Sequence, residues 1–476
     1  MAKYFMQTAF GAVVASAVMA TPALAQSVVS EFFAKMTEAG ATVTFDKNED
    51  GGTTTWNNVV AEFDDGQGGG TMTLDWVREA QNGDSYTITL APELVTKFNA
   101  EGEEGVLTVG NNGLAYLVNR SGDGLSMAYS ASSISFSMQA GKELTDFTVN
   151  MNDVSGNDTI DDADWMSGSG QMQAGGMTMT FGVDDNDMAM TMETGYDDLS
   201  LTYAFDGFAG NMENPEALLG ALLQFNMQSG GGSGSGSFGE DGQNISFTFT
   251  GGASDASFDM SNGEISYSGG AGDIAYSINP TAMGFPPVDI SLSEAAFAFG
   301  MPISETDGPV DVQYLVQLLG LEVSEGLWRM FDPSQTIPRD PADLVIDLAA
   351  TAQWTMNPAD LAEGEPDAMP IQFEDVSVNE IRLSIGGAEI SANGSAKVMN
   401  GGPFPLPIGK LDIAINGVNG LIDKLTALGL LTPDMVLPVR AMMGVYTTPV
   451  GDDQMTSSVE MTADGQVLAN GLPLPN

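Results

Sequence analysis

The chain of 476 residues carries a net charge of −50, because 64 Asp and Glu residues outnumber 14 Lys and Arg residues. It contains no cysteine and no histidine, which excludes disulfides, most structural zinc sites and catalysis of the Ser-His or Cys-His type. Such an acidic surface repels nucleic acid and anionic membrane faces, so we expect neither as a partner.

The N-terminus has the pattern of a cleaved secretory signal. Lys3 precedes an apolar run over residues 10–19, and Ala23-Leu24-Ala25 forms a small-residue cleavage site. We therefore expect residues 1–25 to be removed and the mature protein to be periplasmic. The apolar run is shorter than the roughly 20 residues that cross a bilayer. No later run reaches that length, so we expect no transmembrane segment after cleavage.

Alternating apolar and polar residues dominate the first half. A helix is predicted over residues 27–39, where apolar residues recur at helical spacing before Gly40. Period-two runs then follow from residue 41 to residue 151 at intervals of about ten, with Gly, Asn and Asp between them. This pattern predicts a mainly β fold with short helices, built from extended antiparallel meander sheets (a curved sheet or a sandwich) capped by amphipathic helices.

Four segments interrupt this pattern. The carboxylate cluster at residues 157–165 breaks the alternation, Asn214-Pro215 begins a predicted second helix that reaches about residue 227, and Ser/Gly residues 229–237 have the composition of a flexible linker. Prolines near Gly284 suggest a boundary between an N-terminal β-rich region, residues 26–284, and a C-terminal α+β region, residues 285–476.

The second half mixes both periods. A third helix is predicted over residues 312–320, then a strand over residues 344–354. Further strands are expected at residues 373–385, 389–398, 409–415 and 456–461. Two more helices are expected, one over residues 418–429 and one that begins at Thr432-Pro433.

Two segments of the second half carry a resemblance to a known family. Residues 327–348, with Trp328, Phe331-Asp332-Pro333 and Pro338-Arg339-Asp340-Pro341, and the ending Asn470-Gly471-Leu472-Pro473-Leu474 are similar to the exported bacterial family known as domain of unknown function 2125. The resemblance implies a periplasmic address and no established activity.

The same ending, with the rhythm of helices and long sheets, also resembles envelope proteins of the AsmA-like, bridge-like lipid-carrier kind. That resemblance implies a long curved sheet with an apolar groove. The usual membrane anchor of those proteins is not found, which favours a soluble carrier or accessory component.

Methionines alternate on two expected strands, at Met177, Met179, Met188, Met190 and Met192. Alternation places each set on one strand face. Three interpretations stay open: simple packing, because methionine fills irregular apolar space; a groove for acyl chains, because flexible side chains adapt to mixed ligands; and Cu(I) binding by soft thioethers.

Two further groups are candidate sites. Asp158, Asp161, Asp162 and Asp164 could bind calcium weakly if their loop folds around the ion, or could simply form a turn. Arg329, Asp332, Arg339 and Asp340 are expected to form a structural clasp that fixes the proline-rich loop, with recognition of an anionic head group as the alternative.

The sequence contains no phosphate loop, no dinucleotide fingerprint and no Gly-x-Ser-x-Gly element. We expect no cofactor and no catalytic residue, hence a protein that is not an enzyme. The leading hypothesis is a soluble periplasmic protein that binds a hydrophobic or lipid-like ligand as an envelope accessory. The alternatives are an outer-membrane porin-like β-barrel and a structural or calcium-responsive surface protein; a protein partner is not indicated.

Overall fold

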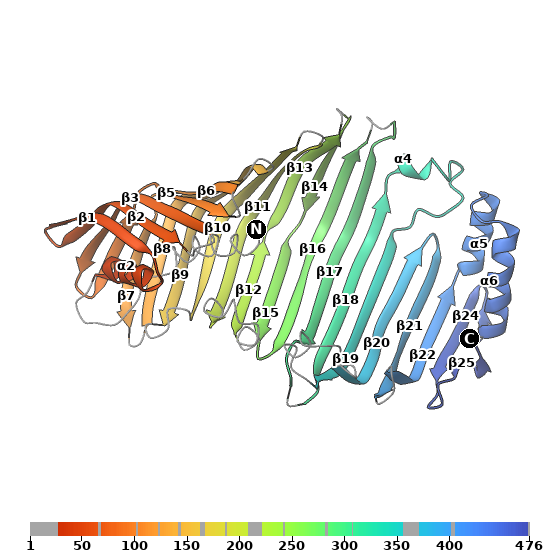
Figure 1. Ribbon diagram of the computed structural model, residues 1–476. Helices are drawn as coiled ribbons and strands as arrows, with labels where there is room; N and C mark the ends of the chain where they lie inside the picture. The colour runs from red at the N-terminus through yellow and green to blue at the C-terminus, as the bar shows by residue number, and fades with distance from the viewer. Residues whose placement is uncertain are drawn as a thin grey trace. The chain divides into compact units, whose positions relative to one another are not determined.

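The computed structural model describes residues 27–64, 68–100, 103–121, 124–140, 144–161, 167–185, 188–207, 221–240, 243–280, 284–306, 308–355, 371–400 and 405–474. Within these ranges the protein is mainly β, with 26 strands that belong to one antiparallel sheet and a few short helices. Figure 1 shows these strands and helices, coloured from red at the N-terminus to blue at the C-terminus. The predicted fold class, a β-dominated protein of antiparallel strands with short helices, is confirmed.

The chain divides into two compact units. Unit 1 comprises Met1–Met212 and Leu222–Thr248, and unit 2 comprises Glu213–Ala221 and Phe249–Asn476. Strand β14 (Gln243–Gly251) crosses this division. The boundary expected near Gly284 falls inside unit 2, between β16 (Glu264–Asn279) and β17 (Val288–Pro302), which pair with each other.

Unit 1 begins with one helix and continues as a run of strands. Their bounds are α2 Val28–Glu38, β1 Thr42–Asp50, β2 Thr53–Asp64, β3 Gly68–Asn82, β4 Ser85–Leu90, β5 Glu93–Ala100, β6 Glu103–Asn112, β7 Ala115–Ser121, β8 Gly124–Ala140, β9 Leu144–Asp161, β10 Gly168–Asp185, β11 Met188–Asp206, β12 Leu222–Ser229 and β13 Gly231–Glu240. The helix expected over residues 27–39 is therefore confirmed.

Polar contacts fix α2 to the sheet. Ser27 caps its first turn by accepting a hydrogen bond from the Ser30 amide at 3.1 Å, and the Glu79 carboxylate of β3 accepts one from the Val29 amide at 3.0 Å. Glu31, which is buried, pairs with Arg120 of β7 at 2.6 Å. The helix thus presents its apolar side to the strands in a defined orientation.

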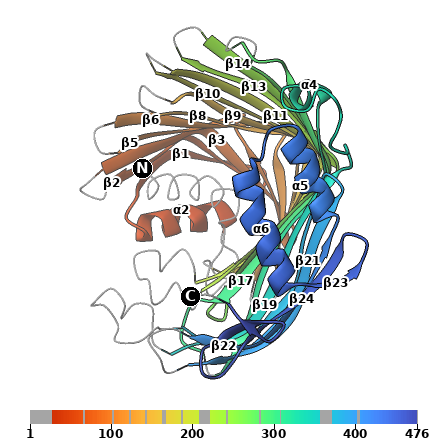
Figure 2. The same ribbon diagram turned by 90° about the vertical axis from the view of Figure 1, so that its right-hand side faces the viewer.

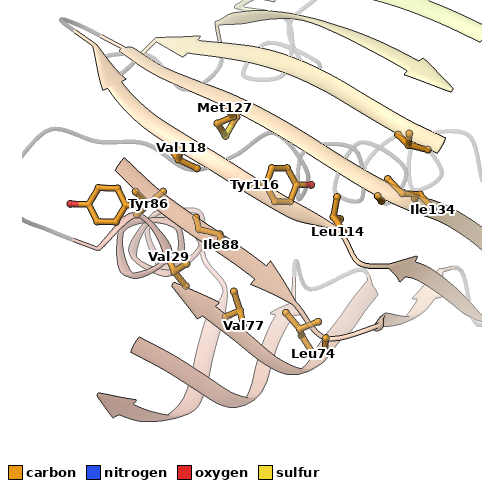
Figure 3. Close-up of a cluster of buried hydrophobic side chains, with 14 of the residues drawn as sticks. Val29, Leu74, Val77, Tyr86, Ile88, Leu114, Tyr116, Val118, Met127 and Ile134 are labelled. Atoms are coloured by element: carbon orange, nitrogen blue, oxygen red, sulfur yellow. The ribbon is translucent and has the colours of Figure 1, made fainter. Parts of the chain in front are cut away.

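The core of unit 1 lies where α2 meets the sheet. Val28, Val29 and Phe33 of the helix are buried against side chains of the surrounding strands, among them Trp56 and Ile88. Figure 3 shows this cluster. The helix supplies the cover that one face of these strands needs, because an antiparallel sheet buries one face and leaves the other in water.

Several strands of unit 1 contain one exposed Asn or Asp that adopts a left-handed conformation. Asn58, Asp153 and Asp198 have φ angles of 53°, 51° and 50° in the middle of β2, β9 and β11. In a regular strand, residues an odd number apart face opposite sides. Across Asp153 of β9, however, Met151 and Val154 are both buried. The left-handed residue therefore shifts the alternation by one residue and keeps the apolar residues on a single face.

Unit 2 continues the antiparallel strands and contains two longer helices before its last four strands. Its strands are β15 Ser254–Ser261, β16 and β17 as given above, β18 Val310–Val323, β19 Ala342–Trp354, β20 Ile371–Ile385, β21 Ala388–Met399, β22 Leu406–Asn416, β23 Thr448–Gly451, β24 Gln454–Met461, β25 Val467–Ala469 and β26 Leu472–Pro473. Its helices are α4 Glu325–Trp328, α5 Val418–Ala427 and α6 Pro433–Tyr446. The last two confirm the helices expected after residues 418 and 432.

Two expected helices are wrong where the structure describes them. Residues 222–229 form strand β12, and the rest of the helix expected from Asn214 lies outside the described residues. Residues 312–320 belong to strand β18, which pairs with β17 and β19 on its two sides. Hydrogen bonds to a strand on each side satisfy the backbone groups of β18. This pairing outweighs the helical spacing of its apolar residues. Likewise, residues 157–161 continue strand β9, and residues 162–166 are not described.

The Ser/Gly segment expected as a linker is strand β13, paired along its length with β11. Tyr196 of β11 lies directly opposite Gly232, and a methyl group on that glycine would come within 2.9 Å of the tyrosine ring. Only glycine therefore fits under the ring. Aromatic residues commonly cover a glycine of a neighbouring strand in this way. A glycine-rich segment can thus form a well-paired strand.

Candidate functional site: an apolar sheet face

The strand register in unit 2 places apolar residues in continuous rows across one sheet face. Residues directly opposite one another on paired strands share a face. One row runs through Phe258, Tyr267, Phe299, Tyr314, Leu348 and Val378. The next two run through Gly269, Phe297, Val316, Ile346, Ile381, Ala392 and Ile413, and through Ala295, Leu318, Leu344, Leu383, Ile390, Ile415 and Met455. We call these three rows the apolar face of unit 2.

The large side chains of this face are only partly covered. Tyr267, Phe299 and Tyr314 keep 44%, 42% and 43% of their surface exposed, and Leu383 keeps 44%. The Tyr267 and Phe297 rings pack together with centroids 4.8 Å apart. Scattered exposed apolar residues are ordinary on a protein surface, whereas contiguous ones mark a site of interaction.

The opposite face of the same strands is polar. One row there runs through Ser266, Gly300, Gln313, Ala349, Ser377, Ser395, Lys410 and Glu460. Ion pairs on this side join Arg382 to Asp343 and Glu380, at 2.7 Å and 2.8 Å. The sheet of unit 2 is therefore amphipathic over many strands, with the ion pairs of Arg382 on the more polar side.

In unit 1, the methionines singled out by the sequence also lie on one face. Met177 and Met179 of β10 lie opposite Tyr196 and Thr194 of β11. Met190 and Met192 lie on the same side of β11 as Tyr196 and Thr194, because all four alternate along the strand. The four methionines therefore share one face of the sheet. All four are half-buried. Met188 begins β11, and its side chain lies outside the described residues. The row through Met192 contains Met138, Phe147, Phe181 and Gly236, which makes this a continuous apolar surface.

Asp158, a candidate calcium ligand, is instead surrounded by tyrosines. It is 4% exposed near the end of β9, and its Oδ1 accepts a hydrogen bond of 2.6 Å from the Tyr203 hydroxyl. Burial raises the pKa of Asp158 to about 6, although the hydrogen bond from Tyr203 acts in the opposite direction. Burial also raises the pKa of Tyr203, Tyr116 and Tyr129, helped by the nearby carboxylate.

The other proposed calcium ligands do not converge on Asp158 in the part of the chain that is described. Asp161, three residues further along β9, is exposed, and Asp162 and Asp164 lie outside the described residues. Within those residues, no group of three or more acidic side chains is arranged to hold a metal ion. Calcium binding by this segment stays a prediction.

The proline-rich loop between β18 and β19 is held by a buried carboxylate. Asp332 is fully buried, and its carboxylate accepts hydrogen bonds from Arg339 at 2.7 Å and from the backbone amides of Thr336 and Ile337, each at 2.9 Å. Burial by itself raises the pKa of Asp332, but these hydrogen bonds outweigh it and lower the pKa to about 2.

Arg339 makes further contacts around this loop, including a hydrogen bond of 3.1 Å to the Asp332 carbonyl. It donates to Glu325 of α4 at 3.1 Å and to the Ile337 carbonyl at 2.7 Å, and its guanidinium lies 4.2 Å from the centre of the Trp328 ring. Arg329 and Asp340, which the sequence placed in the same clasp, are exposed and lie outside these contacts. Because the Arg339 guanidinium is already engaged, this arrangement fits a structural role better than a head-group site.

What sequence reasoning missed is the apolar face of unit 2. Its aromatic residues come from four strands, and only the pairing register brings Tyr267, Phe299 and Tyr314 into one row. The available signal was the alternation within each strand, such as Phe297 with Phe299 and Leu344 with Ile346 and Leu348. Alternation identifies a face of one strand but not its neighbours.

None of the described helices is long and apolar enough to cross a membrane. Comparison with curated proteins and with solved structures gives no match. Residues 271–476 match the model of the family described as "Uncharacterized protein conserved in bacteria (DUF2125)". This segment contains both motifs that carried the resemblance and most of the apolar face of unit 2. The C-terminal part of the chain, residues 271–476, therefore belongs to the DUF2125 family.

Proposed function

We propose that this protein binds the acyl chain of a lipid along the apolar face of unit 2. The observation that carries the proposal is the set of contiguous apolar rows whose aromatic and aliphatic side chains, Tyr267, Phe299, Tyr314 and Leu383 among them, keep about two-fifths of their surface exposed. A ligand laid along these rows removes that surface from water without any change of fold.

The chemistry of the face fits a flexible hydrocarbon better than a compact, polar ligand. The rows offer ring faces and branched aliphatic groups, and charged groups collect on the other side of the sheet. Each CH₂ group that leaves water contributes about 0.8 kcal/mol, so about ten of them give a gross gain of roughly 8 kcal/mol, from which ordering of the chain must be subtracted. A binding free energy of about −8 kcal/mol corresponds to a dissociation constant of about 1 μM, so we expect dissociation constants above that value.

The proposal is of a binding protein and not of an enzyme. The two carboxyl groups with the most altered pKa values, Asp158 and Asp332, both serve as buried hydrogen-bond acceptors within the fold. The methionine face of unit 1, with Met177, Met179, Met190 and Met192, offers the same chemistry in a more adaptable form, and we propose it as a second surface for acyl chains.

We further propose that the mature protein works in the periplasm as an envelope accessory, as the N-terminal signal pattern suggests. Fractionation tests this location. The mature protein should leave the cells on osmotic shock. Its mass should be lower than that of the full-length chain by the mass of residues 1–25. Retention of the full-length chain in the cytosolic fraction would contradict it.

Ligand binding is tested with a fluorescent fatty acid and matched variants on one strand. Tyr267→Asn places an amide on the apolar face, whereas Ser266→Asn places the same group on the polar face one residue away. We expect the first variant to weaken binding about tenfold and the second to leave it unchanged. Equal affinities of the two variants and the wild type would show that the ligand does not lie on this face.

A further inference from the structure

Helix α6 presents apolar side chains to solvent along most of its circumference. Met435, Leu437, Val439, Met442 and Val445 are 56%, 73%, 47%, 57% and 54% exposed, and none of its residues is buried. A surface helix of a globular protein ordinarily turns such residues toward the core. This helix does the reverse.

Polar contacts on its inner side fix this orientation. Arg440 donates to Asp423 of α5 at 2.6 Å and to the Asn419 carbonyl at 3.3 Å, and Ser457 of β24 donates to the Tyr446 carbonyl at 2.7 Å. Figures 1 and 2 show α6 alongside α5 at the C-terminal strands of unit 2. The exposure of the outward apolar side chains is therefore built into the fold, because Arg440 and the Tyr446 carbonyl hold the opposite side of the helix.

The helix also ends against the apolar face of unit 2. Ser457 lies opposite Ile413 in one of the three rows, and its hydroxyl holds the last turn of α6 through Tyr446. Leu430, before the helix, and Val450, on the strand that follows it, are 46% and 61% exposed. The exposed apolar surface of α6 is thus connected with the surface on which we place the acyl chain.

Charge indicates what covers this helix. Its only charged residues are Asp434 in the first turn and Arg440, which is turned toward α5. The outward side from Met435 to Val445 has no charged side chain and no side-chain hydrogen-bond donor. A protein partner ordinarily finds hydrogen bonds across an interface at about one per 100–200 Å², whereas a lipid surface needs none. In a chain of net charge −50, anionic lipids are disfavoured.

We propose that α6 docks the protein onto the surface of a neutral, zwitterionic phospholipid bilayer. Its 14 residues span about 21 Å along the helix axis, and a spanning helix needs roughly 20 residues, so α6 lies in the plane of the interface with its outward side chains among the upper acyl chains. The inference extends the proposed function, because it names the place where a lipid binder meets its source of ligand.

Flotation with phosphatidylcholine vesicles tests the docking. The double variant Leu437→Asn, Met442→Asn changes two outward residues of α6, and Met330→Asn is the matched control, because Met330 is 56% exposed in a loop of the same unit. We expect the wild type and the control to float with the vesicles and the double variant to lose at least tenfold in vesicle affinity, with an unchanged circular dichroism spectrum.

Two results would overturn the docking. One is equal flotation of all three proteins. The other is a wild type that fails to float and is a dimer by light scattering, while the double variant is a monomer; α6 would then be covered by a second copy of the chain.

Binding of the fluorescent fatty acid without vesicles separates this inference from the proposed function. The double variant should bind the fatty acid as the wild type does. If the wild type did not bind the fatty acid but still floated with vesicles through α6, only the proposed function would be refuted.

Discussion

Phe297 of β17 lies directly opposite Gly269 of β16, and a methyl group on the glycine would come within 3.0 Å of the phenylalanine ring. The ring therefore rests over the glycine on the apolar face of unit 2. The same arrangement recurs in unit 1 for Tyr196 over Gly232. Some of the 58 glycines of the chain are thus positions at which an aromatic side chain fills the space that a neighbour leaves.

Gly269→Ala should destabilise unit 2, because the added methyl group meets both the Phe297 ring and, at 2.7 Å, the Asp255 carbonyl. Overpacking of this kind costs about 1–3 kcal/mol. Gly300→Ala on β17 is the control, since its methyl group would make only ordinary contacts at 3.6 Å or more. Denaturant unfolding of the two variants measures the difference, and equal midpoints would contradict the packing described.

Asp158 makes the stability of unit 1 depend on pH. Its pKa is about 6 in the folded protein and 3.8 when unperturbed, so the folded state holds a proton that the unfolded state has lost. The associated stability is present below pH 4 and is lost as pH rises through about 6. Asp158→Asn should remove this loss and raise stability at pH 7 by about 1–2 kcal/mol.

Thermal unfolding of Asp158→Asn at pH 4 and pH 7 measures the effect, with Asp153→Asn, an exposed change on the same strand, as the control. The control should follow the wild type at both pH values. If the Asp158 variant kept the wild-type dependence on pH between 4 and 7, another group would be responsible.

The buried pair that holds α2 should matter far more than an exposed pair on the same helix. Arg120→Met removes the guanidinium beside buried Glu31, which typically costs about 3–5 kcal/mol. Lys35→Met removes an exposed pair with Glu38 and should cost no more than about 0.5 kcal/mol. Chemical denaturation compares the two variants, and similar losses would show that α2 is not held through Arg120.

Asp332 should stabilise the folded protein only at pH values above its own low pKa. Because hydrogen bonds lower that pKa to about 2, below its ordinary value of 3.8, the stability it contributes is present above pH 4 and is lost as pH falls through 2. Asp332→Asn should lower the melting temperature at pH 7 and flatten its fall in acid. Asp340→Asn, an exposed change in the same loop, should match the wild type throughout.

The sequence predicts the class of fold and the terminal elements well, because α2 and α5 have apolar residues at helical spacing, α6 begins with a proline in its first turn, and most strands alternate. It fails where a long strand contains a left-handed residue or an interrupted alternation. The period-two runs at residues 126–129 and 134–138 are separate in the sequence, yet both belong to β8. Asp153 adopts a left-handed conformation inside β9. One sequence shows a change of alternation but not whether the chain turns back there.

The candidate site was predictable only in part. The alternation of Met177 with Met179 and of Met190 with Met192 indicates a strand face, and the structure places all four on one face of unit 1. The aromatic row of unit 2 depends on the register between β16, β17 and β18, which residue spacing does not specify. For β18 the helical spacing of Val312, Leu315 and Val316 favours the wrong element, and only pairing with both neighbours corrects it.

Native mass spectrometry of the protein, purified gently from the envelope fraction, tests the binding of lipid on the apolar face most directly. The account predicts a mass above that of the mature chain by one or more phospholipids or fatty acids, lost on delipidation and regained with added fatty acid by the wild type and Ser266→Asn but much less by Tyr267→Asn. A bare polypeptide mass before and after addition of fatty acid would contradict it.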